Sequence, residues 1–235
     1  MLDPTKVRAI SLDLDDTLWL VWPTIERAEQ ALREWLFAHA PATARLYADT
    51  VALRAVREEI QHLRPDLQAD LSGLRRESIR LALTRAGDAP HLAEPAFDVF
   101  FDHRQRVDLF DDVLPCLQKL SRRFPLVSLS NGNADVARVG IGDYFCAAVS
   151  AVALGVGKPD PRIFQAAARI AGVAAHEVLH VGDDATLDVR GARRCGMQAV
   201  WVNRAAHTWP VDADQERPHL EVRDLHALCD LLGIS

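Results

Sequence analysis

Short runs of apolar, often β-branched residues recur along the chain, separated by longer segments with helical periodicity. Each run is too short for a typical helix and lacks alternating polar positions, which is the pattern of a strand buried on both faces. The runs are Val7–Leu12, Leu126–Leu129, Val178–Val181 and Ala199–Val202. Helical spacing lies at residues 113–122, 161–171, 184–195 and 224–232. This alternation predicts an α/β fold with a doubly wound parallel sheet.

The segment after the first run departs from this alternation. It shows no convincing strand, and its apolar residues recur at helical spacing. They fall into three groups: Ile25, Ala28, Leu32, Trp35 and Leu36; Leu46, Leu53, Val56, Ile60 and Leu63; Leu74, Ile79 and Leu81. We expect a fourth helix with Pro95 at its first position and Phe97, Phe100 and Phe101 on one face. We therefore expect a core of residues 1–20 and 108–235, interrupted by a helical domain of residues 21–107.

Polar clusters follow three of the four predicted strands. They comprise Asp13, Asp15 and Thr17, then Ser130, Asn131 and Gly132, then Asp183 and Asp184. Ligands of open parallel sheets bind outside the carboxyl ends of the strands, so we expect these clusters to converge. The fourth run ends at Asn203 and offers no comparable cluster.

Several acidic side chains would share this edge of the sheet. Asp13 and Asp15 are two positions apart on an extended segment, so their side chains point the same way. With Asp183 beside them, their mutual repulsion requires a cation, and ligands that are all oxygen favour Mg²⁺. Lys158 would add a second positive charge, and Ser130 with the backbone around Gly132 would donate hydrogen bonds to an oxyanion.

Composition and charge exclude several function classes. The 235 residues carry a net charge of -6 and no basic run longer than two, so no basic surface for nucleic acid is expected. The apolar stretch Tyr144–Gly157 is shorter than the roughly 18 residues of a membrane span. The N-terminus lacks a signal-peptide pattern, and the four cysteines form no C-x-x-C pair. We expect a cytoplasmic protein without nucleic-acid or membrane partners; its oligomeric state is undefined by the sequence.

Four short motifs, in this order, resemble those of the haloacid dehalogenase-like superfamily. They are Asp-x-Asp-x-Thr at 13–17, Ser130 at a strand end, Lys158-Pro159, and Gly182-Asp183-Asp184 with Asp188 beyond it. One motif alone is weak, whereas four in the right order are specific. The position and helical character of residues 21–107 also resemble the C1 cap of this superfamily.

The resemblance implies a magnesium-dependent phosphatase acting on a small phosphorylated metabolite. Asp13 would attack phosphorus and form an aspartyl phosphate. Asp15 would act as general acid and then general base, held by Thr17. The metal would bind Asp13, the backbone carbonyl of Asp15, and Asp183.

The remaining motif residues receive supporting roles from the same resemblance. Lys158 would neutralise the transferring phosphoryl group. Ser130, Asn131, Gly132 and Thr17 are expected on the substrate side. Asp184 and Asp188 are expected behind the metal ligands, with Asp188 orienting waters or Lys158.

Two features of the sequence narrow the range of reactions that we expect. Dehalogenases of the superfamily lack an acid at the position of Asp15, because halide leaves without a proton, so dehalogenation is set aside. Phosphonate-cleaving relatives need a cap lysine. The only lysines here are Lys6, Lys119 and Lys158, so residues 21–107 contain none and phosphonate cleavage is excluded. A phosphomutase acting on a sugar phosphate and a non-catalytic ligand-binding module remain as alternatives.

Further segments resemble a group of bacterial phosphatases of riboflavin biosynthesis that act on FMN and ribitylaminouracil phosphate. They are Ser-Asn-Gly-Asn-Ala at 130–134, Gly-Asp-Tyr-Phe at 142–145, Leu-His-Val-Gly-Asp-Asp at 179–184 and Gly-Met-Gln-Ala at 196–199. These two compounds are therefore the expected substrates. We expect His180, Trp19 and Trp22 to be core residues.

Overall fold

The computed structural model describes residues 1–210 and 216–234, and the chain divides into two compact units. One consists of Met1–Leu20 with Asp108–Ser235, and the other of Val21–Val107. We refer to them as the core unit and the helical unit. Residues 211–215 and 235 of the expected core range lie outside the described residues. No helix of the described part is both long and apolar enough to cross a membrane.

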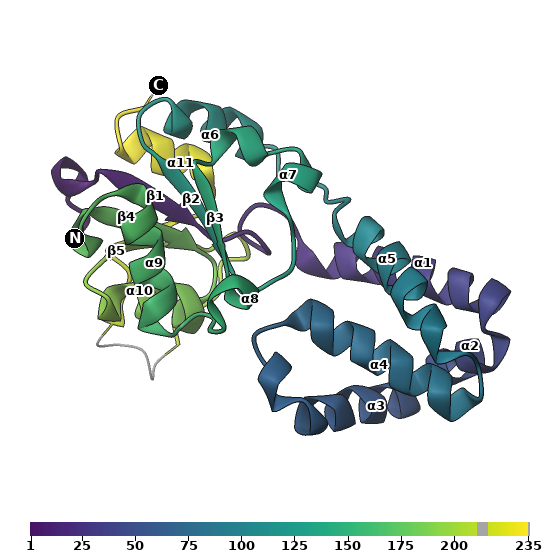
Figure 1. Ribbon diagram of the computed structural model, residues 1–235. Helices are drawn as coiled ribbons and strands as arrows, with labels where there is room; N and C mark the ends of the chain where they lie inside the picture. Colours follow the sequence, from purple (N-terminus) through teal and green to yellow (C-terminus); the bar gives the residue numbers. More distant parts are fainter. Residues whose placement is uncertain (211–215, 235) are drawn as a thin grey trace. The chain divides into compact units, whose positions relative to one another are not determined.

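The core unit is built on a parallel sheet of six described strands in the order β3-β2-β1-β4-β5-β6 (Figure 1). Neighbouring strands run parallel throughout. The strands are β1 Ala9–Leu12, β2 Leu126–Ser130, β3 Ala147–Ser150, β4 Val178–Gly182, β5 Gln198–Val202 and β6 Leu220–Val222. Every residue of β1, β2, β4 and β5 is buried, which confirms the apolar runs as central strands.

The sequence pattern did not predict β3 and β6. Both are short edge strands with partly exposed residues, and β3 is rich in alanine rather than β-branched side chains. An edge strand needs no continuous apolar run, because one of its sides is not covered by another strand. The hydrophobic pattern therefore identified the four inner strands only.

Helices cover both faces of this sheet, which makes the fold doubly wound, as expected. They are α6 Val113–Ser121, α7 Val136–Val139, α8 Ala151–Leu154, α9 Pro161–Ala171, α10 Gly191–Arg194 and α11 Leu225–Leu231. Figure 1 shows α9 and α10 on one face, with α6 and α11 on the other. Ile163 and Phe164 of α9 pack with Val127 and Val149 of the sheet in one buried cluster. Short 3-10 turns lie at Pro4–Lys6, Gly142–Tyr144 and Ala175–Glu177.

The helix expected over residues 184–195 is not continuous. Ala185–Arg190 forms a π-helical segment, and α10 follows it directly. The Val189 N–H donates to the Asp184 carbonyl, five residues back, at 3.2 Å. Such wide turns occur mostly at functional sites. This one carries Asp188.

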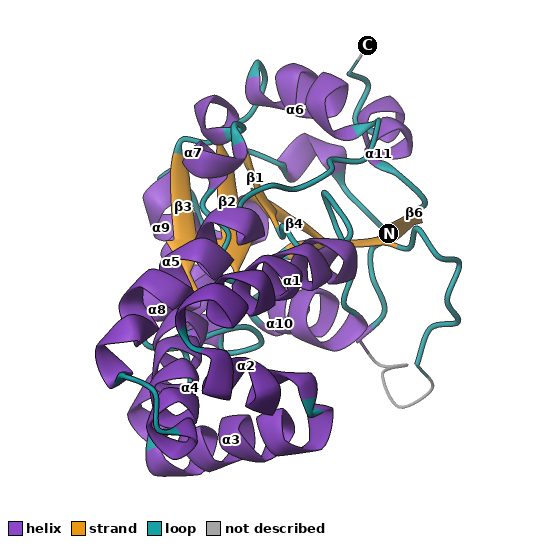
Figure 2. Cartoon of the chain, turned by 90° about the vertical axis from the view of Figure 1, so that its right-hand side faces the viewer, coloured by secondary structure: helices purple, strands orange, loops and turns teal. Residues whose placement is uncertain are grey.

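The helical unit consists of helices joined by loops (Figure 2), and it has a hydrophobic core of its own. Its helices are α1 Val21–His39, α2 Pro41–Ala48, α3 Thr50–Leu63, α4 Leu71–Ala86 and α5 Ala93–Arg104, with 3-10 turns at Pro65–Leu67 and Pro90–Leu92. Leu32 and Leu36 of α1 pack in one buried cluster with Ile79 of α4 and Phe97 of α5. The predicted helical periodicity therefore reflects burial within this unit.

Three expectations for the helical unit were wrong in detail. The second apolar group spans two helices, because the Asp49 side chain accepts the Val51 and Ala52 N–H groups and starts α3. Pro95 is the third residue of α5, a position tolerated because first-turn N–H groups have no partner within the helix. Trp22 is 69% exposed and is not a core residue.

Candidate active site

The three polar clusters meet at one edge of the sheet. Asp13 follows β1, Ser130 is the last residue of β2, and Asp183 follows β4. Strand β1 lies between β2 and β4 and runs parallel to both, so the ends of these strands are neighbours. The convergence expected from the sequence is therefore present.

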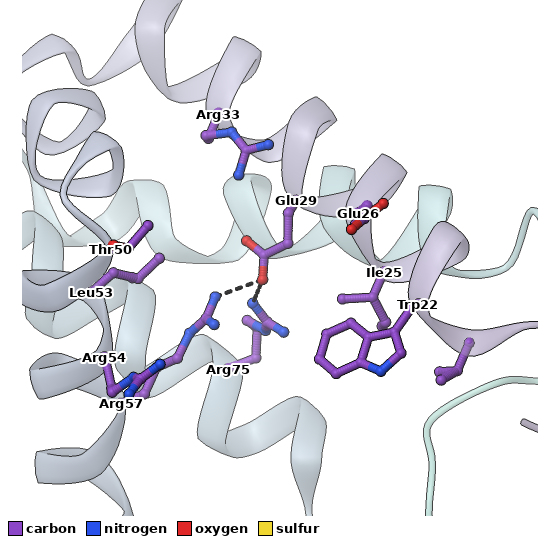
Figure 3. A pocket seen from close by; sticks show the side chains of 11 residues that line it. Trp22, Ile25, Glu26, Glu29, Arg33, Thr50, Leu53, Arg54, Arg57 and Arg75 are labelled. Carbon is purple, nitrogen blue, oxygen red and sulfur yellow. Dashed lines mark hydrogen bonds and ion pairs between the residues drawn. The ribbon is translucent and has the colours of Figure 1, made fainter.

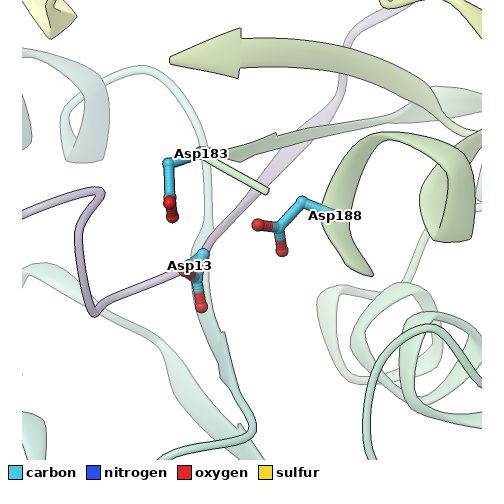
Figure 4. A group of neighbouring side chains, drawn as sticks. All are labelled: Asp13, Asp183 and Asp188. Carbon is cyan, nitrogen blue, oxygen red and sulfur yellow. The ribbon is translucent and has the colours of Figure 1, made fainter. Parts of the chain in front are cut away.

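Three carboxylates face one another at this edge (Figure 4). Asp13, Asp183 and Asp188 each offer an oxygen, and these oxygens all lie within 4.8 Å of one another. Asp13 and Asp188 are buried, and Asp183 is partly buried. The structure thus places Asp188 in the same group as Asp13 and Asp183, rather than only behind them.

Lys158 is inserted between two of these carboxylates. Its Nζ donates to Asp13 Oδ1 at 2.5 Å and to Asp188 Oδ1 at 2.6 Å. Burial alone would lower the pKa of this amine, but Asp13 and Asp188 outweigh burial and raise the pKa above its usual value. Lys158 is therefore a permanently charged group next to Asp13.

A buried chain of hydrogen bonds supports Asp188. His180 Nε2 lies 3.0 Å from Asp188 Oδ1, and the Ser11 hydroxyl lies 2.9 Å from His180 Nδ1. Burial would raise the pKa of Asp188, but Lys158 and His180 hold it below its usual range. Burial lowers the pKa of His180, so the neutral ring donates from Nε2 and accepts from Ser11. His180 is a buried core residue, as expected, with both ring nitrogens paired.

The protein environment disfavours the ionised form of the other two carboxylates, Asp13 and Asp183. Burial raises the pKa of Asp13 well above its usual value, with Lys158 opposing and Asp188 adding to the shift. Burial and the Asp188 charge raise the pKa of Asp183 to about 7. A cation would relieve this repulsion, and a set of carboxylate oxygens fits Mg²⁺. Asp13 and Asp183, with Asp188 close by, are the side chains that fit such an ion.

Asn131 holds the loop that carries Lys158. Its Nδ2 donates to the Lys158 carbonyl at 2.9 Å, and its Oδ1 accepts the Lys158 N–H at 2.6 Å. A β-carbon at Gly157 would lie 2.6 Å from Asn131 Oδ1, so this close approach needs glycine. The Asn131 amide is thus engaged in positioning Lys158, and its expected place on the substrate side stays a prediction. Ser130 Oγ accepts the Gly132 N–H at 2.9 Å, which leaves its hydroxyl proton to donate.

The segment after β1 folds back sharply and places Asp15 against Trp19. The Trp19 Nε1–H donates to Asp15 Oδ1 at 2.8 Å, and Trp19 is fully buried. Asp16, at φ 59°, adopts the left-handed conformation that aspartate tolerates better than most residues. The Thr17 hydroxyl donates to Asp183 Oδ1 at 3.0 Å. Thr17 thus supports the acid at the end of β4, and Trp19 bonds the Asp15 carboxylate. The expected role of Thr17 in holding Asp15 stays a prediction.

Arg204 anchors this turn from the other side. Its Nε and Nη2 donate to the Thr17 carbonyl at 3.1 and 3.0 Å. Its Nη1 and Nη2 also donate to the two oxygens of Asp112, at 3.0 and 2.9 Å. The edge beyond Asn203, where the sequence showed no comparable cluster, therefore contributes a site-supporting arginine. The only signal in the sequence for this role of Arg204 is its position as a charged residue shortly after a buried strand.

Close packing and a helix cap fix the carboxylate of Asp188. A β-carbon at Gly182 would lie 2.3 Å from Asp188 Cγ, so only glycine leaves room for that side chain. The Asp184 carboxylate accepts the Thr186 and Leu187 N–H groups at 2.7 Å each, and its own N–H donates to Asp188 Oδ2. Asp184 thus starts the π-helical segment and orients Asp188.

Comparison with known proteins agrees with this geometry. Residues 7–196 match the family described as haloacid dehalogenase-like hydrolase. The chain is 33% identical to the 5-amino-6-(5-phospho-D-ribitylamino)uracil phosphatase YigB of Escherichia coli, covering 97% of each chain. It is 34% identical to the phosphoserine phosphatase of Thermus thermophilus, covering 93% of this chain and 96% of that one.

A solved structure described as a 2-haloacid dehalogenase from Pseudomonas syringae pv. Tomato is also similar. It is 38% identical, with a TM-score of 0.90 over 97% of this chain and 98% of that chain. The match of the family, the full-length relatives and the order of the site residues lead to one conclusion. This chain belongs to the haloacid dehalogenase-like hydrolases.

Proposed function

We propose that the protein is a magnesium-dependent phosphatase of small phosphorylated metabolites that works through an aspartyl phosphate on Asp13. The observation that carries this proposal is the pairing of Asp13 with Lys158 beside a second, separately held acid, Asp15. A nucleophilic carboxylate and a separate general acid are the two groups that hydrolysis of a phosphate ester through an aspartyl phosphate needs.

In the first step an Asp13 oxygen attacks phosphorus, and the bond from phosphorus to the leaving oxygen breaks. Asp15 gives its proton to that oxygen, so the leaving group departs as an alcohol. In the second step Asp15 takes a proton from water. The water oxygen attacks phosphorus, and the Asp13 carboxylate is released with inorganic phosphate.

Positive charge and hydrogen-bond donors serve the phosphoryl oxygens during both steps. The Lys158 ammonium is bonded to the Asp13 carboxylate and so lies next to the transferring group, and the Ser130 hydroxyl can donate to a phosphoryl oxygen. Mg²⁺, held by Asp13, Asp183 and the Asp15 carbonyl, would supply further charge stabilisation when bound. Asp188 keeps Lys158 in place, since it accepts from Nζ at 2.6 Å.

The substrate assignment draws on the relatives. YigB is described as a phosphatase of a ribitylaminouracil phosphate, and it matches this chain over almost its full length. Together with the segment resemblances, this supports ribitylaminouracil phosphate or FMN as substrate, and hence a role in riboflavin biosynthesis. We also propose that the helical unit, residues 21–107, is the cap that selects the leaving group.

A second candidate, dehalogenation of 2-haloacids, is favoured by the similarity to the Pseudomonas syringae structure. It uses Asp13 as nucleophile as well, but it needs no general acid. The hydrogen bond from Trp19 that holds Asp15 therefore favours the phosphatase.

Product analysis on a substrate panel decides between these reactions. We would measure phosphate release from FMN, ribitylaminouracil phosphate, phosphoserine and glucose 1-phosphate with Mg²⁺, and halide release from 2-chloropropionate. The proposal expects phosphate release that disappears in Asp13→Asn. Halide release alone would establish the second candidate, and isomerised sugar phosphate would indicate a phosphomutase. Tight FMN binding without any turnover would indicate a non-catalytic binding module.

A further inference from the structure

A cavity of about 570 Å³ lies entirely within the helical unit. Side chains of α1, α3 and α4 line it (Figure 3). Its volume is within the range of roughly 300–1,000 Å³ that is typical of small-molecule sites. None of the residues with a role in the proposed mechanism belongs to its lining.

The polar lining is mostly cationic. It contains four arginines and two glutamates: Arg33, Arg54, Arg57, Arg75, Glu26 and Glu29. The difference is two positive charges, so a small dianion would neutralise the cavity. Arg54 has no hydrogen-bond or ion-pair partner among the described residues, and Arg33 donates to the neutral Gln30 at 2.9 Å. These two guanidinium groups are available to an anion.

Glu29 is the second polar feature of the cavity. It is 9% exposed, and its Oε1 accepts from Arg57 at 2.6 Å and from Arg75. Burial opposes ionisation, but these two arginines hold the pKa of Glu29 below its usual value, so both oxygens are acceptors.

The other oxygen of Glu29 is unsatisfied. Oε2 is buried and has no hydrogen-bond partner in the described part of the chain. In Figure 3 the dashed lines to Arg57 and Arg75 meet at the opposite oxygen. A buried carboxylate oxygen without a donor keeps the full cost of its lost hydration. The ion pairs with Arg57 and Arg75 do not satisfy this oxygen, because both end at Oε1. A hydroxyl or amino group of a ligand would satisfy it.

The remaining wall is apolar. Trp22 and Ile25 lie along α1 to one side of Glu29, and Leu53 comes from α3 (Figure 3). Trp22 is 69% exposed, so its indole ring offers apolar surface to a ligand. An organic ligand would therefore find apolar surface beside the polar groups.

We propose that this cavity is a binding site for a small organic dianion that also carries a hydroxyl or amino group. The anionic groups bind Arg33 and Arg54, and the N–H or O–H group donates to Glu29 Oε2. This site is distinct from the residues of the proposed mechanism and does not depend on the phosphatase activity.

Calorimetric titration of the full chain tests the site with two probes that differ by one hydroxyl group. L-malate carries a hydroxyl and succinate does not, while both are dianions. We expect malate to bind about tenfold more tightly, which corresponds to one hydrogen bond of about 1.4 kcal/mol. Glu29→Gln should remove this preference yet retain succinate binding, because the arginines remain.

Charge variants provide the control. Arg54→Ala should weaken both probes about tenfold. Arg169→Ala, which removes an exposed arginine of α9, should leave both affinities unchanged. Absence of saturable binding of either probe, or equal affinities in wild type and Arg54→Ala, would overturn the proposal.

Kinetics then identify the natural source of the ligand. If the cavity receives the leaving group of the phosphatase substrate, malate inhibits competitively and Arg54→Ala raises KM. If it receives a separate effector, Arg54→Ala leaves KM unchanged without malate. Both kinetic outcomes are compatible with the binding site. The calorimetric affinities do not depend on turnover, so a failure of the phosphatase proposal would be distinguishable from a failure of the site.

Discussion

The indole Nε1–H of Trp19 donates to Oδ1 of Asp15 at 2.8 Å, from a fully buried ring. This bond fixes the carboxylate that the proposed mechanism uses for proton transfer. The backbone contributes as well, since the Asp16 N–H donates to the Trp19 carbonyl at 2.7 Å. Trp19 is therefore a positioning residue for Asp15.

Trp19→Phe should lower kcat for alkyl phosphates about tenfold, a fraction of the 10²–10⁴-fold that general acid–base catalysis supplies. The effect should shrink with p-nitrophenyl phosphate, whose leaving group needs little protonation. Trp209→Phe is a matched control, because the Trp209 Nε1 is buried without a partner among the described residues. Equal losses on both substrates would mean that Trp19 has only a structural role.

Gly182→Ala should impair both catalysis and stability. Its β-carbon would lie 2.3 Å from Asp188 Cγ, so the carboxylate must move away from Lys158. We expect at least a tenfold loss of kcat and a destabilisation of about 1–3 kcal/mol, typical of overpacking. Gly73→Ala meets the Asp70 carboxylate at 2.6 Å and Leu67 Cδ2 at 3.1 Å, both in the helical unit, and should keep full activity. Urea denaturation and steady-state kinetics measure both effects; an active, stable Gly182→Ala protein would contradict this packing argument.

The hydrophobic pattern predicted the inner strands and the helical insertion because both depend on local burial. It missed β3 and β6, most of whose residues are not buried. It also treated residues 46–63 as one helix, since a capping aspartate such as Asp49 leaves the apolar spacing intact.

Asp13, Ser130 and Asp183 could be predicted because they lie at the end of a strand or directly after it. The residues that position them could not, because they depend on contacts between distant segments. Arg204 bonds the Thr17 carbonyl 187 residues away. Asn131 was recognised as part of the site, but its bond to the Lys158 backbone requires knowledge of how that loop returns.

Mg²⁺ should raise Tm of the wild-type protein, because it reduces the repulsion among Asp13, Asp183 and Asp188. Saturation at 100 times Kd adds about 2.7 kcal/mol, or several degrees for a chain of this size. Asp183→Asn should abolish this shift, while its metal-free Tm stays at or above that of the wild type. Asp184→Asn retains a good helix cap and should keep the shift. Thermal scans with Mg²⁺ and with EDTA provide the measurement, and an Asp183→Asn protein that still gains stability would exclude Asp183 as a ligand.

His219 should make stability depend on pH. Burial and the Arg193 guanidinium, 2.7 Å from Nε2, lower the pKa of His219 to about 4 from the usual 6.5. Between these values the unfolded chain binds a proton that the folded chain does not. The stabilisation is therefore complete above about pH 6.5 and is lost as pH falls toward 4.

Denaturation curves at pH 7 and pH 5 check this expectation. His219→Gln should lose less stability on acidification than the wild type does. His176→Gln, at an exposed position, should behave as wild type. An unchanged pH dependence in His219→Gln would show that other groups control this range.

The proposed mechanism requires that Asp13 becomes phosphorylated during turnover. Rapid acid quench of the enzyme with its best phosphate ester, followed by mass spectrometry of the peptide that contains Asp13, tests it directly. We expect one added phosphoryl group on Asp13 within the first turnover, absent in Asp13→Asn. Phosphate release without any phosphorylated Asp13, or unchanged turnover in Asp13→Asn, would contradict it.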